Sequence, residues 1–181
     1  MIAMPELSAN LWTAWRTIDD WWKKYWGVDL ALNNVSWGEW TAGAITPFIV
    51  TALAPSLGCR PVRLEKTGEK QKRIRADYVL FKDQEELVYI EHESYSRDVY
   101  GEMTKLIAAK VPLKVVVTYD QESVLEDLAK DIFRRVEERS DSSDWLLIGG
   151  ITDSSENMVD LSKWVAYSIP NLKGKTTITR L

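Results

Sequence analysis

An ordered series of strand-like and helix-like segments between residues 75 and 119 constrains the fold of this chain most strongly. Two apolar runs, RADYVLF (75–81) and ELVYIEHE (86–93), flank the polar turn KDQE, and a helix-like segment (96–110) leads into the Val-rich run LKVVVTY (113–119). The first two runs are close enough in sequence to pair as an antiparallel hairpin. The strand–helix–strand unit that follows predicts a right-handed parallel crossover. The chain is therefore expected to be an α/β protein with a mixed sheet.

Helical periodicity precedes this region. Residues 7–26 form an amphipathic pattern that holds five of the nine tryptophans. A tryptophan face can stack on nucleic-acid bases. At helical spacing, however, it is more typical of a protein core or a dimer interface. One expectation is therefore a homodimer that forms through this helix. A second helix is expected from Ser36 to about Leu57. Ser36 and Glu39 have the capping-box spacing, and Pro47 should kink the helix or mark a fresh start.

The remaining segments complete the alternation of helix and strand. Residues 60–68 predict a half-exposed strand, and 145–151 an apolar one. A weaker strand pair, 163–169 and 176–181, closes the chain around the turn NLKGK. Between these strands, a long amphipathic helix follows Asp120, and its buried side is expected to comprise Val124, Leu125, Leu128, Ile132, Phe133 and Val136.

The overall composition limits the classes of function. With 181 residues we expect one domain, divided into N-terminal helices (1–57), a core (58–119) and completing helix and strands (120–181). The single cysteine and the single histidine exclude an internal disulfide, multi-cysteine zinc sites and two-histidine metal motifs. No secretory pattern or membrane-spanning run is visible, so the expected compartment is the reducing cytoplasm, without a membrane partner.

Three acids lie inside the two strand-like runs, where apolar side chains are expected. If Asp77 lies opposite Glu91, with Val79 opposite Tyr89 and Phe81 opposite Leu87, then Asp77, Glu91 and Glu93 project from one face. A slip of one residue would move Asp77 to the other face. Converging carboxylates without histidine or thiol suit Mg²⁺ or Mn²⁺. Such a metal supports phosphodiester hydrolysis.

A basic run precedes the acids. Seven basic residues and two acids between Arg60 and Arg75 give a local net charge of +5, although the whole chain carries −4. One interpretation is a solvated strand pair and loop. The other is a surface that holds the phosphate backbone of DNA, formed by Arg63, Lys66, Lys70, Lys72, Arg73 and Arg75.

The stretch 62–119 resembles the PD-(D/E)xK nuclease superfamily, which includes restriction endonucleases and Holliday-junction resolvases. The resemblance rests on Asp77, thirteen intervening residues and then Glu91-His92-Glu93, within a helix–strand–strand–strand–helix–strand order. It implies a restriction endonuclease-like three-layer fold, with a central mixed sheet flanked by helices, to which this chain adds a Trp-rich N-terminal helix. It also implies that Asp77 and Glu91 bind the metal, and that Glu39 matches the helix-borne glutamate that many members use.

The chain departs from the family pattern at Glu93, which stands where the family has lysine. Some restriction enzymes carry glutamate there, with a role in activating the attacking water, and in others the lysine moves to the following helix. This implies Glu93 as the group that activates water and Lys105 as a helper.

These residues lead us to expect a Mg²⁺- or Mn²⁺-dependent nuclease acting on DNA. One alternative is an inactive nucleic-acid-binding or protein-interaction domain in which Glu91 and Glu93 pair with Arg73, Arg75 or Lys105. A hydrolase of small phosphate esters is a third. For Glu102 and Lys105 themselves, a surface ion pair is the simpler interpretation.

Overall fold

The structure is a computed structural model that describes residues 4–26, 36–63, 76–152, 161–172 and 175–181. Its main sheet has seven strands in the order β1-β2-β3-β4-β5-β6-β9. β3, β4 and β5 are parallel to one another, and the other neighbours are antiparallel. The strands are β1 (Arg60–Arg63), β2 (Tyr78–Lys82), β3 (Glu85–His92), β4 (Leu113–Asp120), β5 (Asp144–Thr152), β6 (Leu161–Ile169) and β9 (Thr179–Arg180). The expectation of a mixed α/β sheet is confirmed.

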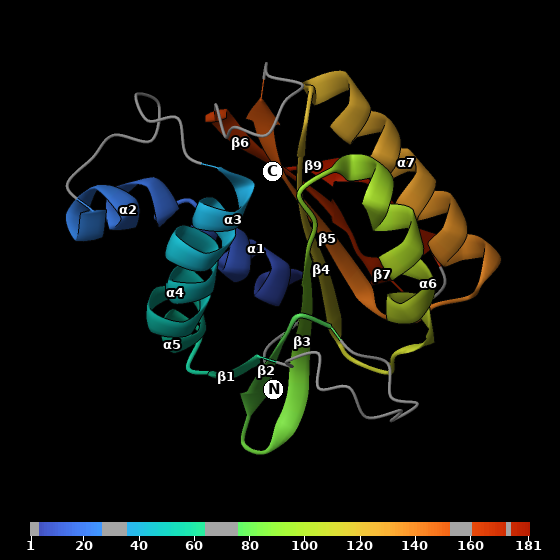
Figure 1. Ribbon diagram of the computed structural model, residues 1–181. Helices are drawn as coiled ribbons and strands as arrows, with labels where there is room; N and C mark the ends of the chain where they lie inside the picture. Colours follow the sequence, from blue (N-terminus) through green and yellow to red (C-terminus); the bar gives the residue numbers. More distant parts are fainter. Residues whose placement is uncertain (1–3, 27–35, 64–75, 153–160, 173–174) are drawn as a thin grey trace, which may run out of the picture.

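Helices cover both faces of this sheet (Figure 1). α1 (Met4–Trp15) and the other N-terminal helices pack on one face, against alternate side chains such as Ile90 and Val115. α6 (Val99–Ala108) and α7 (Glu122–Glu138) pack on the other, against Val116 and Leu147. Since successive strand residues point to opposite faces, a doubly covered sheet explains why β4 and β5 are apolar almost throughout. Among the described residues, no helix is both long and apolar enough to cross a bilayer.

The Trp-rich segment forms two helices instead of the one expected. α1 ends at Trp15 and α2 (Ile18–Trp26) begins after a turn in which both the N–H and the hydroxyl of Thr17 donate to the carbonyl of Ala14. Trp12, Trp15 and Trp22 are buried in the core on that face of the sheet. The interpretation of the tryptophan face as protein core is therefore confirmed. Tyr25, at the end of the pattern, is exposed.

The second helical segment begins where the sequence predicts. Ser36 is the N-cap of α3 (Trp37–Trp40), and the capping box with Glu39 is complete. Helical turns then continue to Ser56 through η2 (Thr41–Ile45), α4 (Thr46–Phe48), η3 (Ile49–Leu53) and α5 (Ala54–Ser56), of which η2 and η3 are π-helical. Each π segment lies just before a proline, Pro47 or Pro55. The wider turn accommodates a residue that lacks an N–H and crowds the preceding turn.

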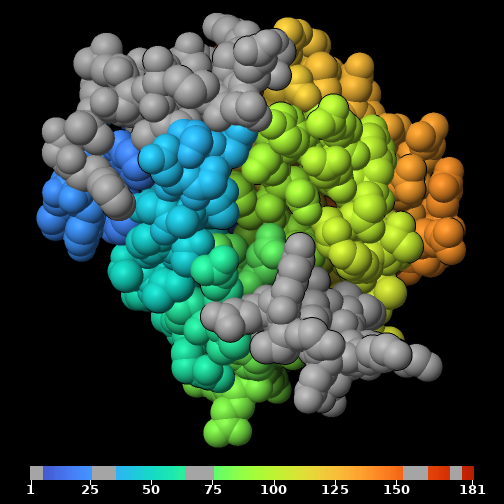
Figure 2. Space-filling view, viewed as in Figure 1, coloured from blue at the N-terminus to red at the C-terminus, as the bar shows by residue number. Residues whose placement is uncertain are grey.

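The β2–β3 hairpin has the expected register at its far end but not near its turn. Val79 lies opposite Tyr89 as predicted, whereas Phe81 lies opposite Glu86, because a bulge follows Leu80. The predicted pairing of Phe81 with Leu87 is therefore wrong. Asp83 and Gln84 both have positive φ and form a two-residue turn, one of the tight hairpin connections that favour this geometry. Figure 2 shows this hairpin, in green, reaching the surface beside the teal N-terminal helices.

The two helices that follow β3 and β4 bury apolar side chains against the sheet. Val99, Met103 and Leu106 of α6 are buried, and α6 is preceded by the short 3₁₀ segment η4 (Ser96–Asp98). In α7, Leu125 is buried, whereas Val124 is exposed, contrary to expectation. The short strands β7 (Asn171–Leu172) and β8 (Lys175–Thr176) form a separate hairpin. β9 returns to pair with β6, so the expected closing strand pair is confirmed.

Candidate metal centre

The carboxylates of interest lie where β3 ends, on the α6 face of the sheet. Tyr89 packs in the core beneath α6 and α7. Because strand residues alternate, Glu91 and Glu93 project from the same face as Tyr89, and His92 projects from the other. β3 and β4 are parallel, and the carboxyl ends of parallel strands are the usual place for ligands in α/β sheets.

Three carboxylates converge at this point. Glu91, Glu93 and Glu102 each offer an oxygen atom, and these atoms lie within 4.8 Å of one another. We call these residues the carboxylate cluster. Glu91 is buried, Glu93 and Glu102 are half-buried, and Glu102 comes from the first turn of α6. The cluster therefore joins the end of a strand to the helix that follows it.

Asp77 lies against the carboxylate cluster without belonging to it. The Asp77 N–H donates to Glu91 Oε2 at 3.3 Å, and the Asp77 carboxylate accepts from the N–H of His92 at 3.1 Å. These reciprocal bonds extend the hairpin beyond its last strand pair, Tyr78–Ile90. The predicted position of Asp77 opposite Glu91 is therefore confirmed. The charge of Asp77 acts on both Glu91 and Glu93, and the carboxylate cluster also contains Glu102, which the sequence did not predict as a member.

Burial and mutual repulsion shift the protonation of two cluster members. Burial raises the pKa of Glu91 to about 9, and the negative charges of Asp77 and Glu102 add to this. Burial likewise raises the pKa of Glu93 to about 7, reinforced by Glu102, Asp77 and Asp98 and opposed by Lys105. The Glu91 Oε1 atom is buried and has no hydrogen-bond partner among the described residues. A buried carboxylate oxygen of this kind is costly unless a proton or a cation satisfies it.

Lys105 supplies a positive charge at the edge of the carboxylate cluster. Its ammonium donates to both oxygens of Glu102 at 2.6 Å, so the surface ion pair expected from the sequence is present. The hydrogen bond to Glu102 raises the pKa of Lys105, and the charges of Glu91 and Glu93 act in the same direction. Glu102 therefore has neighbours of two kinds, one ammonium group and two carboxyl groups.

The His92 side chain projects from the opposite face of β3. Its Nε2 atom lies 2.8 Å from the hydroxyl of Tyr119, which also accepts from Trp40 Nε1 at 2.7 Å. All three residues are buried, and burial lowers the pKa of His92 to about 4, so the ring is neutral near pH 7. This agrees with the interpretation of His92 as a satisfied core residue. The network fixes β3 and β4 to α3 directly behind the carboxylate cluster.

The other predicted site residues are placed as follows. Glu39 is exposed, and its carboxylate accepts from the N–H and hydroxyl of Ser36, so it is not brought to the carboxylate cluster. The hydrogen bonds from Ser36 lower the pKa of Glu39. Arg63 ends β1 opposite Tyr78. The other predicted DNA-binding residues lie outside the described part of the chain: Lys66, Lys70, Lys72, Arg73 and Arg75.

Sequence reasoning missed Glu102 as a cluster member. The available signal was its place in the first turn of the helix after the strand, one turn before Lys105. What the sequence could not give is the angle at which α6 crosses the end of β3. Comparisons with known proteins found no matching family model, no matching curated protein and no matching solved structure.

Proposed function

We propose that this chain is a metal-dependent nuclease of the PD-(D/E)xK type, with a restriction endonuclease-like arrangement of its sheet, that hydrolyses phosphodiester bonds of DNA. The observation that carries the proposal is the convergence of Glu91, Glu93 and Glu102 at the carboxyl end of a parallel strand. Structural salt bridges seldom gather three carboxyl groups, because their mutual repulsion must be offset by a proton or a cation.

The residues present fit a hard divalent cation. All donors in the carboxylate cluster are oxygens, which suits Mg²⁺ or Mn²⁺. The unsatisfied Glu91 Oε1 atom provides an independent reason for a ligand at this position. Glu91, Glu93 and Glu102 would hold the ion, and Asp77 would orient Glu91 through its N–H. A bound ion of this type polarises a phosphoryl oxygen and lowers the pKa of water.

The chain's own side chains supply the remaining chemistry. Glu93 is half-buried and offers one oxygen to the carboxylate cluster, so its second carboxylate oxygen would be the group that accepts a proton from water. The raised pKa of Lys105 keeps its ammonium protonated beside the carboxylate cluster, where it can neutralise charge on a phosphate. The basic run that ends at Arg75 would hold the nucleic-acid backbone.

A second candidate function is a non-catalytic domain on the same sheet, binding nucleic acid or protein. It is favoured by the ion pair between Lys105 and Glu102, because an internal ammonium group already neutralises part of the cluster's charge. In this case the Glu91 carboxyl would stay protonated and no ion would be needed.

Calorimetry with Mn²⁺ and cleavage assays separate these two functions. We expect wild-type protein to bind Mn²⁺ and to cut at least one of linear, single-stranded or branched DNA. Glu91→Ala should abolish Mn²⁺ binding, and Glu93→Gln should slow cleavage by about 10²- to 10⁴-fold, the range for loss of a general base. Glu126→Ala, on the exposed side of α7, is the matched control and should change neither. Unchanged Mn²⁺ binding in Glu91→Ala, or intact DNA of every form with either metal, would remove the nuclease proposal.

A further inference from the structure

A chain of aromatic side chains runs from the core to the surface near the carboxylate cluster. Trp40 and Tyr119 are fully buried, and each contacts Trp164. Beyond Tyr119, Trp37 lies 4.5 Å away between ring centroids, and Tyr95 lies 6.1 Å beyond Trp37. Trp37 and Tyr95 are only half-buried. Burial therefore decreases along this chain toward the end of β3.

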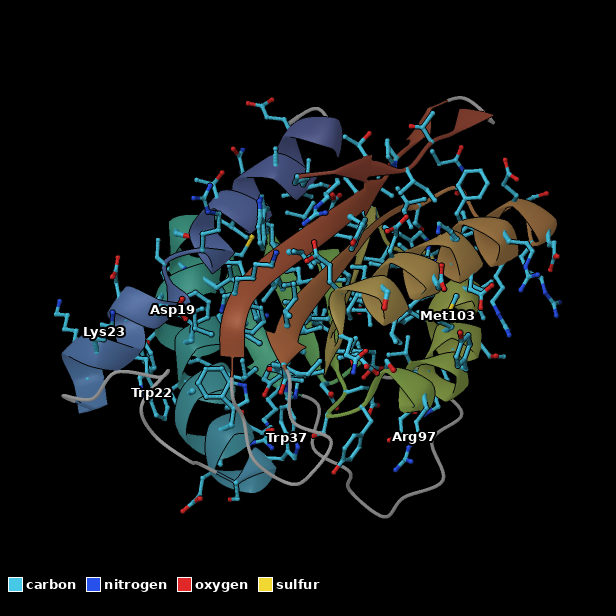
Figure 3. All side chains as sticks on the ribbon, turned by 90° about the horizontal axis from the view of Figure 1, so that it is seen from above. Asp19, Trp22, Lys23, Trp37, Arg97 and Met103 are labelled. Carbon is cyan, nitrogen blue, oxygen red and sulfur yellow. The ribbon has the colours of Figure 1, made fainter. Side chains whose placement is uncertain are left out.

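Of the two half-buried members, Tyr95 lies close in the chain to the proposed reaction centre. Tyr95 follows Glu93 by two residues, so their Cα atoms are separated by at most about 7 Å of extended chain. Trp37 begins α3, on the opposite side of the sheet from α6. Figure 3 shows Trp37 and Arg97 at the same edge of the molecule, Trp37 beside the N-terminal helices and Arg97 beside α6.

Arg97 completes this surface with a positive charge. Its guanidinium lies 4.9 Å from the centroid of the Tyr95 ring, and its side chain is 79% exposed. The 3.9 Å contact with Asp98 is an exposed ion pair and costs little to break. A flat aromatic ring beneath an exposed planar cation can receive a nucleobase, because both surfaces stack on π-systems and the cation also attracts phosphate.

We propose that Trp37, Tyr95 and Arg97 form a stacking surface for an unpaired nucleobase, so that the proposed nuclease acts on single-stranded nucleic acid or single-stranded ends. This inference rests on the proposed function for the identity of the ligand as nucleic acid. In a duplex, both faces of a base are occupied by its neighbours, so a stacking surface at the side of the site selects bases that are already unstacked. The selection arises beside Glu93, where the phosphate must lie.

The test is fluorescence anisotropy in the absence of divalent metal, with a fluorescein-labelled oligo(dT) single strand and the corresponding dT·dA duplex. Wild-type protein should bind the single strand at least about tenfold more tightly. Tyr95→Ala should weaken single-strand binding by roughly 5- to 150-fold, the loss expected for one base–aromatic stack, and leave duplex binding within about twofold. Tyr95→Phe, which keeps the ring, should bind as wild type does.

Tyr100→Ala is the matched control. Tyr100 is an exposed tyrosine that, like Tyr95, lies beneath an arginine, since the Arg135 guanidinium lies 5.3 Å from its ring centroid, but it faces α7 and hydrogen-bonds to Asp131. Its replacement should leave both affinities unchanged. Equal affinity for single strand and duplex, an equal loss of both in Tyr95→Ala, or no single-strand binding at all would overturn the proposal.

The outcomes also separate this inference from the proposed function. If the protein binds single strands through Tyr95 but cuts nothing when Mn²⁺ is added, the nuclease proposal fails and the stacking surface stands. If the protein cuts duplex DNA while Tyr95→Ala and wild type bind all forms alike, the stacking surface fails and the nuclease stands.

Discussion

Replacing Glu91 by glutamine should stabilise the metal-free protein at neutral and alkaline pH. The Glu91 carboxyl is 3% exposed, and its Oε1 atom has no hydrogen-bond partner among the described residues. Glutamine has the same shape, keeps an oxygen that can accept from the Asp77 N–H, and cannot ionise. The substitution therefore removes the free-energy cost of keeping this buried carboxyl protonated above its ordinary pKa, and it creates no cavity.

The magnitude follows from the raised pKa of Glu91. With a folded value of about 9 and an unfolded value of 4.5, the folded chain binds an extra proton between these two pH values. The contribution of this proton uptake to the free energy of unfolding is therefore fully present below pH 4.5 and is lost as the pH rises toward 9. Between 4.5 and neutrality the loss extends over roughly 2.5 pH units at about 1.4 kcal/mol each, which gives about 3 kcal/mol. For a chain of this size that corresponds to about 6–12 °C in melting temperature.

Thermal unfolding followed by circular dichroism in the presence of a chelator measures this effect. At about pH 5, only half a pH unit above the unfolded pKa of 4.5, the difference between wild type and Glu91→Gln should shrink to about 1 kcal/mol, or about 2–4 °C. At about pH 7 the variant should melt about 6–12 °C higher. A smaller decline should remain in the variant, since the pKa of Glu93 is also raised, to about 7.

A second substitution on the same strand controls for nonspecific effects of charge. Glu85→Gln removes an exposed carboxylate from the turn end of β3 and should follow the wild-type melting curve at both pH values. If Glu91→Gln and Glu85→Gln behave alike, or if the wild-type melting temperature does not fall between pH 5 and 7, the assignment of Glu91 as a buried, repelled carboxyl is refuted.

Two buried networks elsewhere give further predictions. Tyr119→Phe leaves Trp40 Nε1 and His92 Nε2 without their shared hydroxyl, so chemical denaturation should show a loss of roughly 2–5 kcal/mol. Tyr100→Phe, which removes an exposed hydroxyl, should cost under about 1 kcal/mol, and equal costs would contradict the network's role. Asp141→Ala leaves the buried ammonium group of Lys114, which lies 2.6 Å from the Asp141 carboxylate, without its ion-pair partner. This should lower the free energy of unfolding by about 3–5 kcal/mol. Removal of the exposed Lys130 charge by Lys130→Ala is the comparison and should cost less than about 1 kcal/mol, so a similar loss in the two variants would refute the importance of burial.

Local patterns account for the parts of the fold that sequence predicts well. The hairpin register could be predicted at Val79 and Tyr89 because alternation of apolar residues fixes which face each side chain occupies. The capping box at Ser36 is likewise a purely local signal. Both features depend on residues that are close in sequence, three positions apart in the capping box and ten in the hairpin pair.

The failures concern contacts between elements distant in sequence or departures from regular geometry. Glu102 joins the carboxylate cluster because α6 packs over the end of β3, and periodicity does not specify that angle. The break at Thr17 and the π-helical turns before Pro47 interrupt patterns that look continuous in sequence. At Gly149, a Cβ atom would lie 2.5 Å from Leu125 Cδ1, so the close approach of α7 to β5 depends on a missing side chain.

The bulge after Leu80 separates the two ends of the β2–β3 hairpin into independent parts. Between the bulge and the turn, the pairing is Phe81 with Glu86 and Lys82 with Glu85; beyond the bulge it returns to the frame that brings Asp77 to Glu91. A residue gained or lost at the tip over evolutionary time can thus be absorbed by the bulge instead of being transmitted along the strands. The hairpin tip is therefore the place where the chain could change in length while Asp77 and Glu91 stay opposite each other.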